Sequence, residues 1–205
     1  MVPIRQIPFD LAPEPDFTFE TFIEAPSNTG AFNVVRAWPA WPAPAMMLLG
    51  PEGTGKTHLG EAWLKHSHGV FLDDAHVRTE DDLFAFINRA LRGDISGLLL
   101  ASRVPPNEWG VSLPDLRSRL SAMPVIQLHE ADDDSLRPIT SALFQRRGRE
   151  VTTDVVDYLL KYTDRNVPAL RATIRLIDET ASSAKADVTK AFTAKVLRET
   201  GDLFD

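Results

Sequence analysis

The residues with the clearest chemical potential form a glycine-rich run that follows an apolar segment. The run is Gly50-Pro51-Glu52-Gly53-Thr54-Gly55-Lys56-Thr57, which matches the phosphate-binding pattern G-x-x-x-x-G-K-[ST] in full. Backbone N–H groups around Gly50, Gly53, Thr54 and Gly55 can curl around phosphate oxygens, and a following helix directs its positive end at them. Lys56 would neutralise β- and γ-phosphates, and the Thr57 hydroxyl would face Mg²⁺. The pattern predicts a site for ADP or ATP with Mg²⁺.

Two further polar positions follow apolar runs. Asp73 and Asp74 end the run Val70-Phe71-Leu72, where an acidic pair would hold the magnesium shell and polarise a water. Together with Thr57, Asp73 is the predicted metal contact. Ser102 ends another run and could sense the γ-phosphate, although a serine without any such role is equally compatible with that position. The five histidines show no spacing typical of metal ligands.

Four short apolar runs predict the strands that must position these residues. They are residues 45–49, 70–72, 98–101 and 125–128. Continuous apolar strands alternating with helical patterns (58–65, 81–91 and 114–120) indicate a parallel sheet covered on both faces. The predicted fold is therefore an α/β phosphate-loop domain of the AAA+ kind with a four-strand core.

After residue 130, the apolar runs that predict strands stop, and only helical patterns follow. Acidic Asp132, Asp133 and Asp134 predict a helix start, Thr153 can cap a second helix, and Pro168 can begin a third. A fourth helix is expected from about 188 to 199. Four of the 15 prolines fall in residues 1–16. We therefore expect an extended tail (1–16), an α/β nucleotide-binding domain (17–130) and a helical lid subdomain (131–205).

Composition excludes several classes of protein. The 205 residues contain no cysteine, which rules out disulfides and thiolate metal sites. No apolar run approaches the roughly 20 residues that span a bilayer, and no signal pattern is present, so we expect a cytoplasmic protein. The net charge of −7 disfavours duplex DNA binding as the main activity. The basic residues Arg146, Arg147 and Arg149 are best explained as the cationic end of a helix.

The run from Gly55 to Leu59 resembles the bacterial replication initiator DnaA and its AAA+ relatives. Residues 19–23 with Ser27-Asn28 resemble the segment that cups adenine in that group. The run Leu113-Pro114-Asp115-Leu116-Arg117-Ser118-Arg119-Leu120 is similar to one branch, the Hda-type regulators that inactivate DnaA. The resemblance extends from about residue 6 to residue 200.

This resemblance implies a regulatory adaptor with two partners. One is the DNA polymerase sliding clamp, which a hexapeptide containing Gln6, Ile7, Phe9 and Leu11 would contact. The other is DnaA, to whose bound ATP the arginine finger Arg119 would be offered. The resemblance is also compatible with a homodimer. A helicase loader-type ATPase, a nucleotide-free interaction protein and a small-molecule kinase are the alternatives.

The sequence departs from these relatives at two places. Only 15 residues separate Thr57 from Asp73, which leaves no room for the further strand that relatives have at the sheet edge. We therefore expect residues 70–72 to form an edge strand or to be covered by another segment. Relatives also offer an arginine to the nucleotide where this chain has Pro168. Either Arg165 or Arg171 would have to reach the nucleotide instead.

Overall fold

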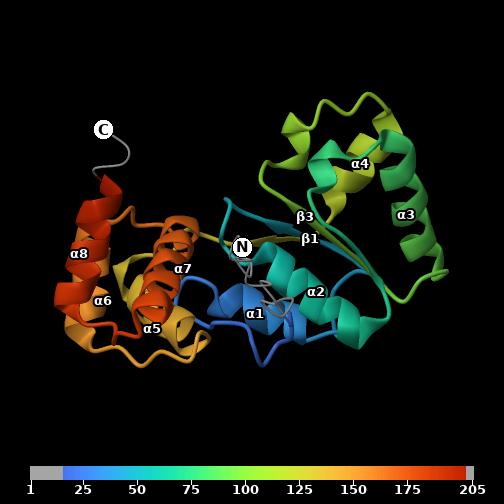
Figure 1. Cartoon of the computed structure of the whole chain (residues 1–205). Coiled ribbons are helices and arrows are strands. Elements are labelled where there is room, and N and C mark those ends of the chain that lie inside the picture. The colour runs from blue at the N-terminus through green and yellow to red at the C-terminus, as the bar shows by residue number, and fades with distance from the viewer. Residues whose placement is uncertain (1–15, 202–205) are drawn as a thin grey trace, which may run out of the picture.

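The computed structural model describes residues 16–201, with side chains to residue 199 (Figure 1). The elements of the first part are α1 (Thr29–Arg36), β1 (Ala45–Leu49), α2 (Lys56–Ser67), β2 (Val70–Leu72), α3 (Glu80–Arg92), β3 (Leu98–Ser102), α4 (Pro114–Ala122) and β4 (Val125–Gln127). The helices of the second part are α5 (Asp133–Gln145), α6 (Thr153–Tyr162), α7 (Val167–Ala184) and α8 (Lys190–Gly201). Two short 3₁₀ turns cover Ala75–Val77 and Pro106–Glu108.

The four strands form one parallel sheet in the order β2-β3-β1-β4. Central β1 pairs with β3 on one side and with β4 on the other, with Met47 opposite both Leu100 and Val125. The predicted four-strand α/β core is confirmed. Strand β2 lies at an edge of the sheet, as the short spacing between Thr57 and Asp73 requires.

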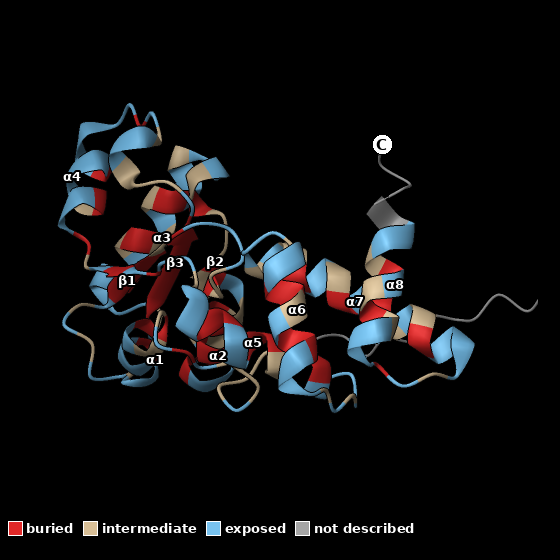
Figure 2. Ribbon diagram, turned by 90° about the vertical axis from the view of Figure 1, so that its left-hand side faces the viewer, coloured by how far each residue is buried: buried red, intermediate tan, exposed pale blue. Residues whose placement is uncertain are grey.

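Alternation along the strands sorts their side chains between two apolar layers. In β1, Met46 and Leu48 join the cluster beneath α1 and α2, whereas Ala45 and Met47 join the cluster beneath α3 and α4. Figure 1 shows these two helix pairs on opposite faces of the sheet, and Figure 2 shows continuous burial in the central strands β1 and β3. Burial on both faces explains why β1 and β3 are apolar at every position except the last residue of β3.

Helices α5–α8 enclose a separate apolar cluster, which includes Phe144, Leu159 and Ile174. The α5 helix begins where expected, because the Asp132 carboxylate accepts a hydrogen bond of 2.9 Å from the Ser135 backbone N–H. Two predicted starts shift by one residue. Thr152 rather than Thr153 is the residue that precedes α6, and Pro168 is the second residue of α7.

The helical unit is tied to the α/β part through the segment before α1. The Ser27 backbone N–H donates to the Ser135 hydroxyl at 3.0 Å, and Ala25 is buried in the apolar cluster of the helical unit. Among residues 16–201, none of the helices has both the length and the apolar character that crossing a bilayer requires.

Candidate functional site

The glycine-rich loop connects β1 to α2 and has the backbone that a phosphate cradle needs. Gly53 and Gly55 have φ angles of +77° and +96°, which place both in the left-handed region that favours glycine. Gly55 precedes the first residue of α2 and has no side chain to satisfy the first helical N–H groups. These donors, with the positive end of α2, therefore remain available to an anion.

Lys56 is buried, and its ammonium is held by the loop itself. Its Nζ donates to the backbone oxygens of Gly50 at 2.7 Å and of Pro51 at 2.6 Å. Burial lowers the pKa of Lys56, and the negative charge of Asp73 opposes that shift. The lysine is therefore fixed at the loop and partly desolvated, which strengthens its attraction for an anion.

Thr57 and Asp73 come together as predicted for a magnesium site. The Thr57 hydroxyl donates to an Asp73 carboxylate oxygen at 2.6 Å. Hydroxyl and carboxylate oxygens suit Mg²⁺, which usually takes one or two protein ligands and completes its shell with phosphate and water. The pair fits this role, and no cluster of three or more acidic or histidine side chains suited to a metal occurs within residues 16–201.

Asp74 turns toward a residue that sequence reasoning missed. Arg103 Nε lies 3.5 Å from an Asp74 carboxylate oxygen, and its Nη1 lies 3.1 Å from a Glu52 oxygen. Arg103 thus links the glycine-rich loop to the end of β2. Together with Lys56 and Thr57, it lines a cavity between the α/β part and the helical unit. The only sequence feature that could have indicated a role for Arg103 in the site is its position directly after the apolar run of β3.

Ser102 is fully buried and directs its hydroxyl to its own loop. The hydroxyl donates to the Val104 backbone oxygen at 2.6 Å and accepts from the Val104 N–H at 3.2 Å. It is not among the residues that line the cavity. The predicted contact of Ser102 with a γ-phosphate would require this turn to open.

Lys56, Thr57, Asp73, Asp74 and Arg103 line this cavity, which has a volume of about 810 Å³ and lies between the α/β part and the helical unit. The cavity has an apolar section lined by Phe17, Phe22, Ile23, Ile139 and Leu143. Phe22 lies close over the loop, because a Cβ added to Gly55 would be 2.9 Å from its ring. The cavity therefore combines a phosphate cradle with apolar lining, to which residues 22 and 23 of the predicted adenine segment contribute.

Pro168 and the neighbouring arginines occupy the helical side of the cavity. A Cβ added to Gly53 would be only 2.4 Å from the Pro168 ring, so α7 begins in direct contact with the loop. Arg171 lines the cavity, whereas Arg165 donates to Asp133 at 3.0 Å and is absent from the lining. Of the two arginines considered as replacements at Pro168, the structure brings only Arg171 to the site.

Arg119 lies on α4, away from this cavity. It donates to Asp115 at 2.9 Å, its guanidinium lies 5.3 Å from the centre of the Phe84 ring, and it is absent from the cavity lining. Arg117 contacts the Val111 backbone oxygen. The predicted clamp-binding residues Gln6, Ile7, Phe9 and Leu11 lie outside the described residues.

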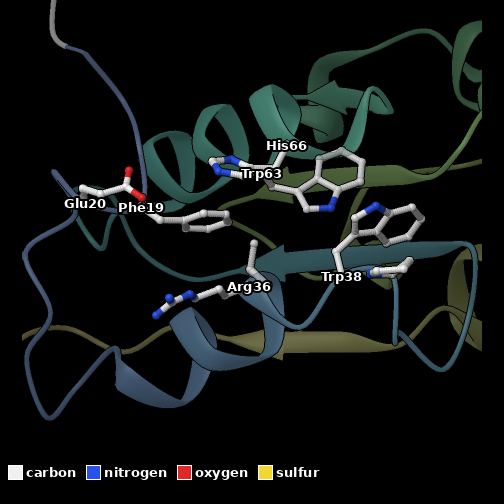
Figure 3. Close-up of a pocket in the computed structure, with 8 residues that line it drawn as sticks. Phe19, Glu20, Arg36, Trp38, Trp63 and His66 are labelled. Carbon is white, nitrogen blue, oxygen red and sulfur yellow. The ribbon is translucent and has the colours of Figure 1, made fainter.

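A second cavity of about 460 Å³ lies between α1 and α2 (Figure 3). Aromatic rings dominate it, with Trp38 and Trp63 edge to face at a centroid separation of 5.6 Å. The Trp63 indole N–H is buried without a hydrogen-bond partner in the described part of the chain. Without a glycine-rich loop or a group of cations, this cavity lacks the features of a polyphosphate site.

Comparison with known proteins agrees with this arrangement. Residues 14–69 match the family model described as the bacterial DnaA ATPase domain. Domain III of the Thermotoga maritima replication initiation protein DnaA is similar in structure, with a TM-score of 0.74 and 18% identity over 90% of this chain and 97% of that one. AMPPCP-bound DnaA from Aquifex aeolicus has a TM-score of 0.74 and 21% sequence identity, over 92% of this chain and 70% of that one.

More distant AAA+ proteins share the fold as well. RuvB from Thermotoga maritima gives a TM-score of 0.63 with 13% identity over 88% of this chain and 71% of that one. Identities this low establish the fold alone. The chain therefore folds as a DnaA-like AAA+ domain, and the segment that contains its phosphate loop is similar in sequence to the ATPase domain of bacterial DnaA.

Proposed function

We propose that this protein is a regulatory adaptor of the Hda type, which binds the sliding clamp and promotes hydrolysis of the ATP held by DnaA. It would thereby limit replication initiation. The observation that carries the proposal is the position of Arg119, which lies outside the cavity of its own chain. An arginine placed there does not reach a nucleotide in this cavity, so any nucleotide that it contacts would be bound by another molecule.

The contacts of Arg119 suit such a role in trans. Its ion pair with Asp115 is made at the surface, where the two side chains are 30% and 59% exposed. Surface pairs of this kind stabilise by only about 0–1 kcal/mol. Exchanging Asp115 for a phosphate oxygen of a partner would therefore cost little.

The cavity of this chain would hold ADP or ATP as a resident nucleotide. Lys56 and the loop N–H groups would bind the phosphates, the apolar section near Phe22 and Ile23 would receive the base, and Thr57 with Asp73 would hold Mg²⁺. Magnesium supplies neutralisation of phosphate charge when bound. This part of the proposal is supported by the matched family segment and by the AMPPCP-bound DnaA structure of the same fold.

The proposal can be tested by an assay that contains ATP-bound DnaA, the sliding clamp loaded on DNA and this protein. The assay measures the rate at which the ATP held by DnaA is hydrolysed. We expect wild-type protein to accelerate hydrolysis and Arg119→Ala to lose nearly all of that stimulation, because an arginine finger contributes about 10³–10⁵ in rate. Nucleotide and clamp binding by the variant should equal those of wild type, since Arg119 serves the partner's site.

Arg117→Ala is the matched control on the same helix. Two residues apart on α4, the two arginines point about 200° apart around the helix axis, so only one can face a given partner. The control should retain stimulation. Loss of stimulation in Arg117→Ala together with full stimulation in Arg119→Ala would show that the finger is assigned to the wrong residue. Absence of stimulation by wild-type protein would overturn the adaptor role.

A further inference from the structure

Two arginines on the helical side of the main cavity have no acidic partner. Arg146 directly follows α5 and Arg171 lies on α7, and both line the cavity. Within residues 16–201, no carboxylate forms an ion pair with either of them. Neighbouring arginines are paired: Arg147 and Arg149 with Asp178 at 3.2 and 2.8 Å, and Arg165 with Asp133 at 3.0 Å. Of the five arginines that line the cavity, Arg103, Arg147 and Arg175 have carboxylate partners, which leaves Arg146 and Arg171 as the two without one in the described part of the chain.

Arg146 and Arg171 also bring two like charges to the same cavity. Burial, and next the positive charge of Arg171, lower the pKa of Arg146. Bringing two like charges together in a partly buried place costs free energy that a bound anion would remove.

The position of Arg171 is fixed by the contact between α7 and the loop. Pro168, one turn earlier on α7, lies against Gly53. Residues three apart share one face of a helix, so Arg171 faces the same cavity as Pro168. Lys56 and the positive end of α2 approach this cavity from the loop side. A ligand between the two sides would therefore meet cations from both.

We propose that Arg146 and Arg171 form one anion subsite, which binds the polyphosphate of a nucleoside di- or triphosphate from the helical side. The inference rests on the proposed nucleotide binding and adds the residues that govern it. Guanidinium groups pair with phosphate through two parallel N–H···O bonds, so two of them can engage adjacent phosphates. A ligand with a single phosphate offers only one such group to the loop and both arginines, so AMP should bind more weakly than ADP.

Titration calorimetry with ADP, ATP, AMP and adenosine in the presence of Mg²⁺ tests this subsite. For ADP and ATP we expect a loss of affinity of roughly ten- to a hundredfold for Arg146→Ala or Arg171→Ala, and a larger loss for the double variant, because each substitution removes hydrogen bonds between charged groups. Binding of adenosine should not change. Arg165→Ala is the matched control, since Arg165 is paired with Asp133 outside the cavity, and it should bind ADP as wild type does.

Melting without nucleotide separates this subsite from a structural role. The double alanine variant should melt no lower than wild type, because the substitutions relieve repulsion and break no ion pair. Arg146→Lys with Arg171→Lys keeps both charges but removes the planar forks, so it should recover only part of the ADP affinity. A lower melting temperature together with full ADP affinity in the alanine variant would make the pair structural and overturn the subsite.

Lys56→Ala distinguishes failure of the subsite from failure of nucleotide binding itself. If Lys56→Ala abolishes ADP binding while the double arginine variant binds as tightly as wild type, the subsite is wrong and the nucleotide site stands. If wild-type protein binds neither ADP nor ATP at millimolar concentration, both the subsite and the resident nucleotide are wrong. The adaptor would then work without nucleotide.

Discussion

At the scale of single residues, the site is organised before any ligand arrives. The Lys56 ammonium, the Thr57 hydroxyl and the Asp73 carboxylate already satisfy one another or the loop through short hydrogen bonds. A buried ammonium left without acceptors would cost several kcal/mol, and the two loop carbonyls remove that cost. A phosphate therefore has to replace a few hydrogen bonds but need not rebuild the site.

His58 gives a pH test of the same region. Its Nε2 lies 2.9 Å from the Thr18 backbone oxygen, and its ring contacts Phe17 and Phe22. Burial lowers the pKa of His58 below 6.5, while the Thr18 contact opposes the shift. Near pH 6 the unfolded chain then binds more protons than the native protein, so stability falls as the pH drops through about 6.5.

Urea unfolding at pH 7.5 and pH 5.5 checks this expectation. The free energy of unfolding should fall between the two pH values, and the fall should be smaller in His58→Gln, whose amide can still donate to Thr18 but does not titrate. Comparing the two proteins cancels the titration of every other group. An identical fall in both would mean that His58 titrates with an ordinary pKa.

At the scale of elements, one contact sets how the helical unit meets the phosphate loop. The side chain of Asn166 accepts a hydrogen bond of 2.8 Å from the Ala169 N–H and so fixes where α7 begins. Pro168 then lies against Gly53, where even a methyl group would clash. The loop and α7 are thus coupled, and movement of one must displace the other.

Gly53→Ala tests that coupling, with Gly93→Ala as its control. Both glycines have a φ of +77°, but nothing lies within 4 Å of a Cβ added to Gly93. In the control, the free energy of unfolding should fall only by the cost of placing an alanine in the left-handed conformation, about 1–2 kcal/mol. Gly53→Ala should melt lower than the control and lose ADP affinity, as measured by thermal shift with and without ADP. Equal melting temperatures of the two variants and intact ADP binding would show that the start of α7 can move away from the loop without a measurable loss of stability.

At the scale of the whole molecule, two different surfaces are presented at once. The cavity opens where the sheet meets the helical unit, while α4 with Arg119 lies on the opposite side of the α/β part (Figures 1 and 2). Under the proposed function, the cavity would hold the nucleotide of this chain while Arg119 contacts the nucleotide of a neighbour. The second proposed partner, the clamp, would be contacted by the residues before Asp16.

The tail assignment predicts a separable loss of function. Replacing Gln6, Phe9 and Leu11 together by alanine should abolish clamp binding in a pull-down, since the proposed contact depends on the glutamine amide and two apolar side chains. The melting temperature should stay unchanged, because we assign these residues to a tail outside the core. Asp10→Ala, within the same segment, is the control and should bind the clamp. Clamp binding by the triple variant at the wild-type level would remove the tail from the proposal.

The sequence alone determined the elements and the type of site. Apolar runs of three to five residues marked the four strands, and the loop motif with its strand and helix predicted the phosphate cradle, because these signals depend on neighbours along the chain. The edge position of β2 also followed from sequence, because 15 residues between Thr57 and Asp73 cannot hold another strand.

Only the tertiary structure decided which side chains meet across elements. Arg146 and Arg147 are neighbours in sequence and both line the cavity, yet Asp178 on α7 pairs with Arg147, and within residues 16–201 Arg146 has no carboxylate partner. Arg165 and Arg171 were equal candidates until the packing of α5 against α7 gave Arg165 an acidic partner. Such choices depend on distances between helices far apart in the chain, and local patterns of residue types contain no information on those distances.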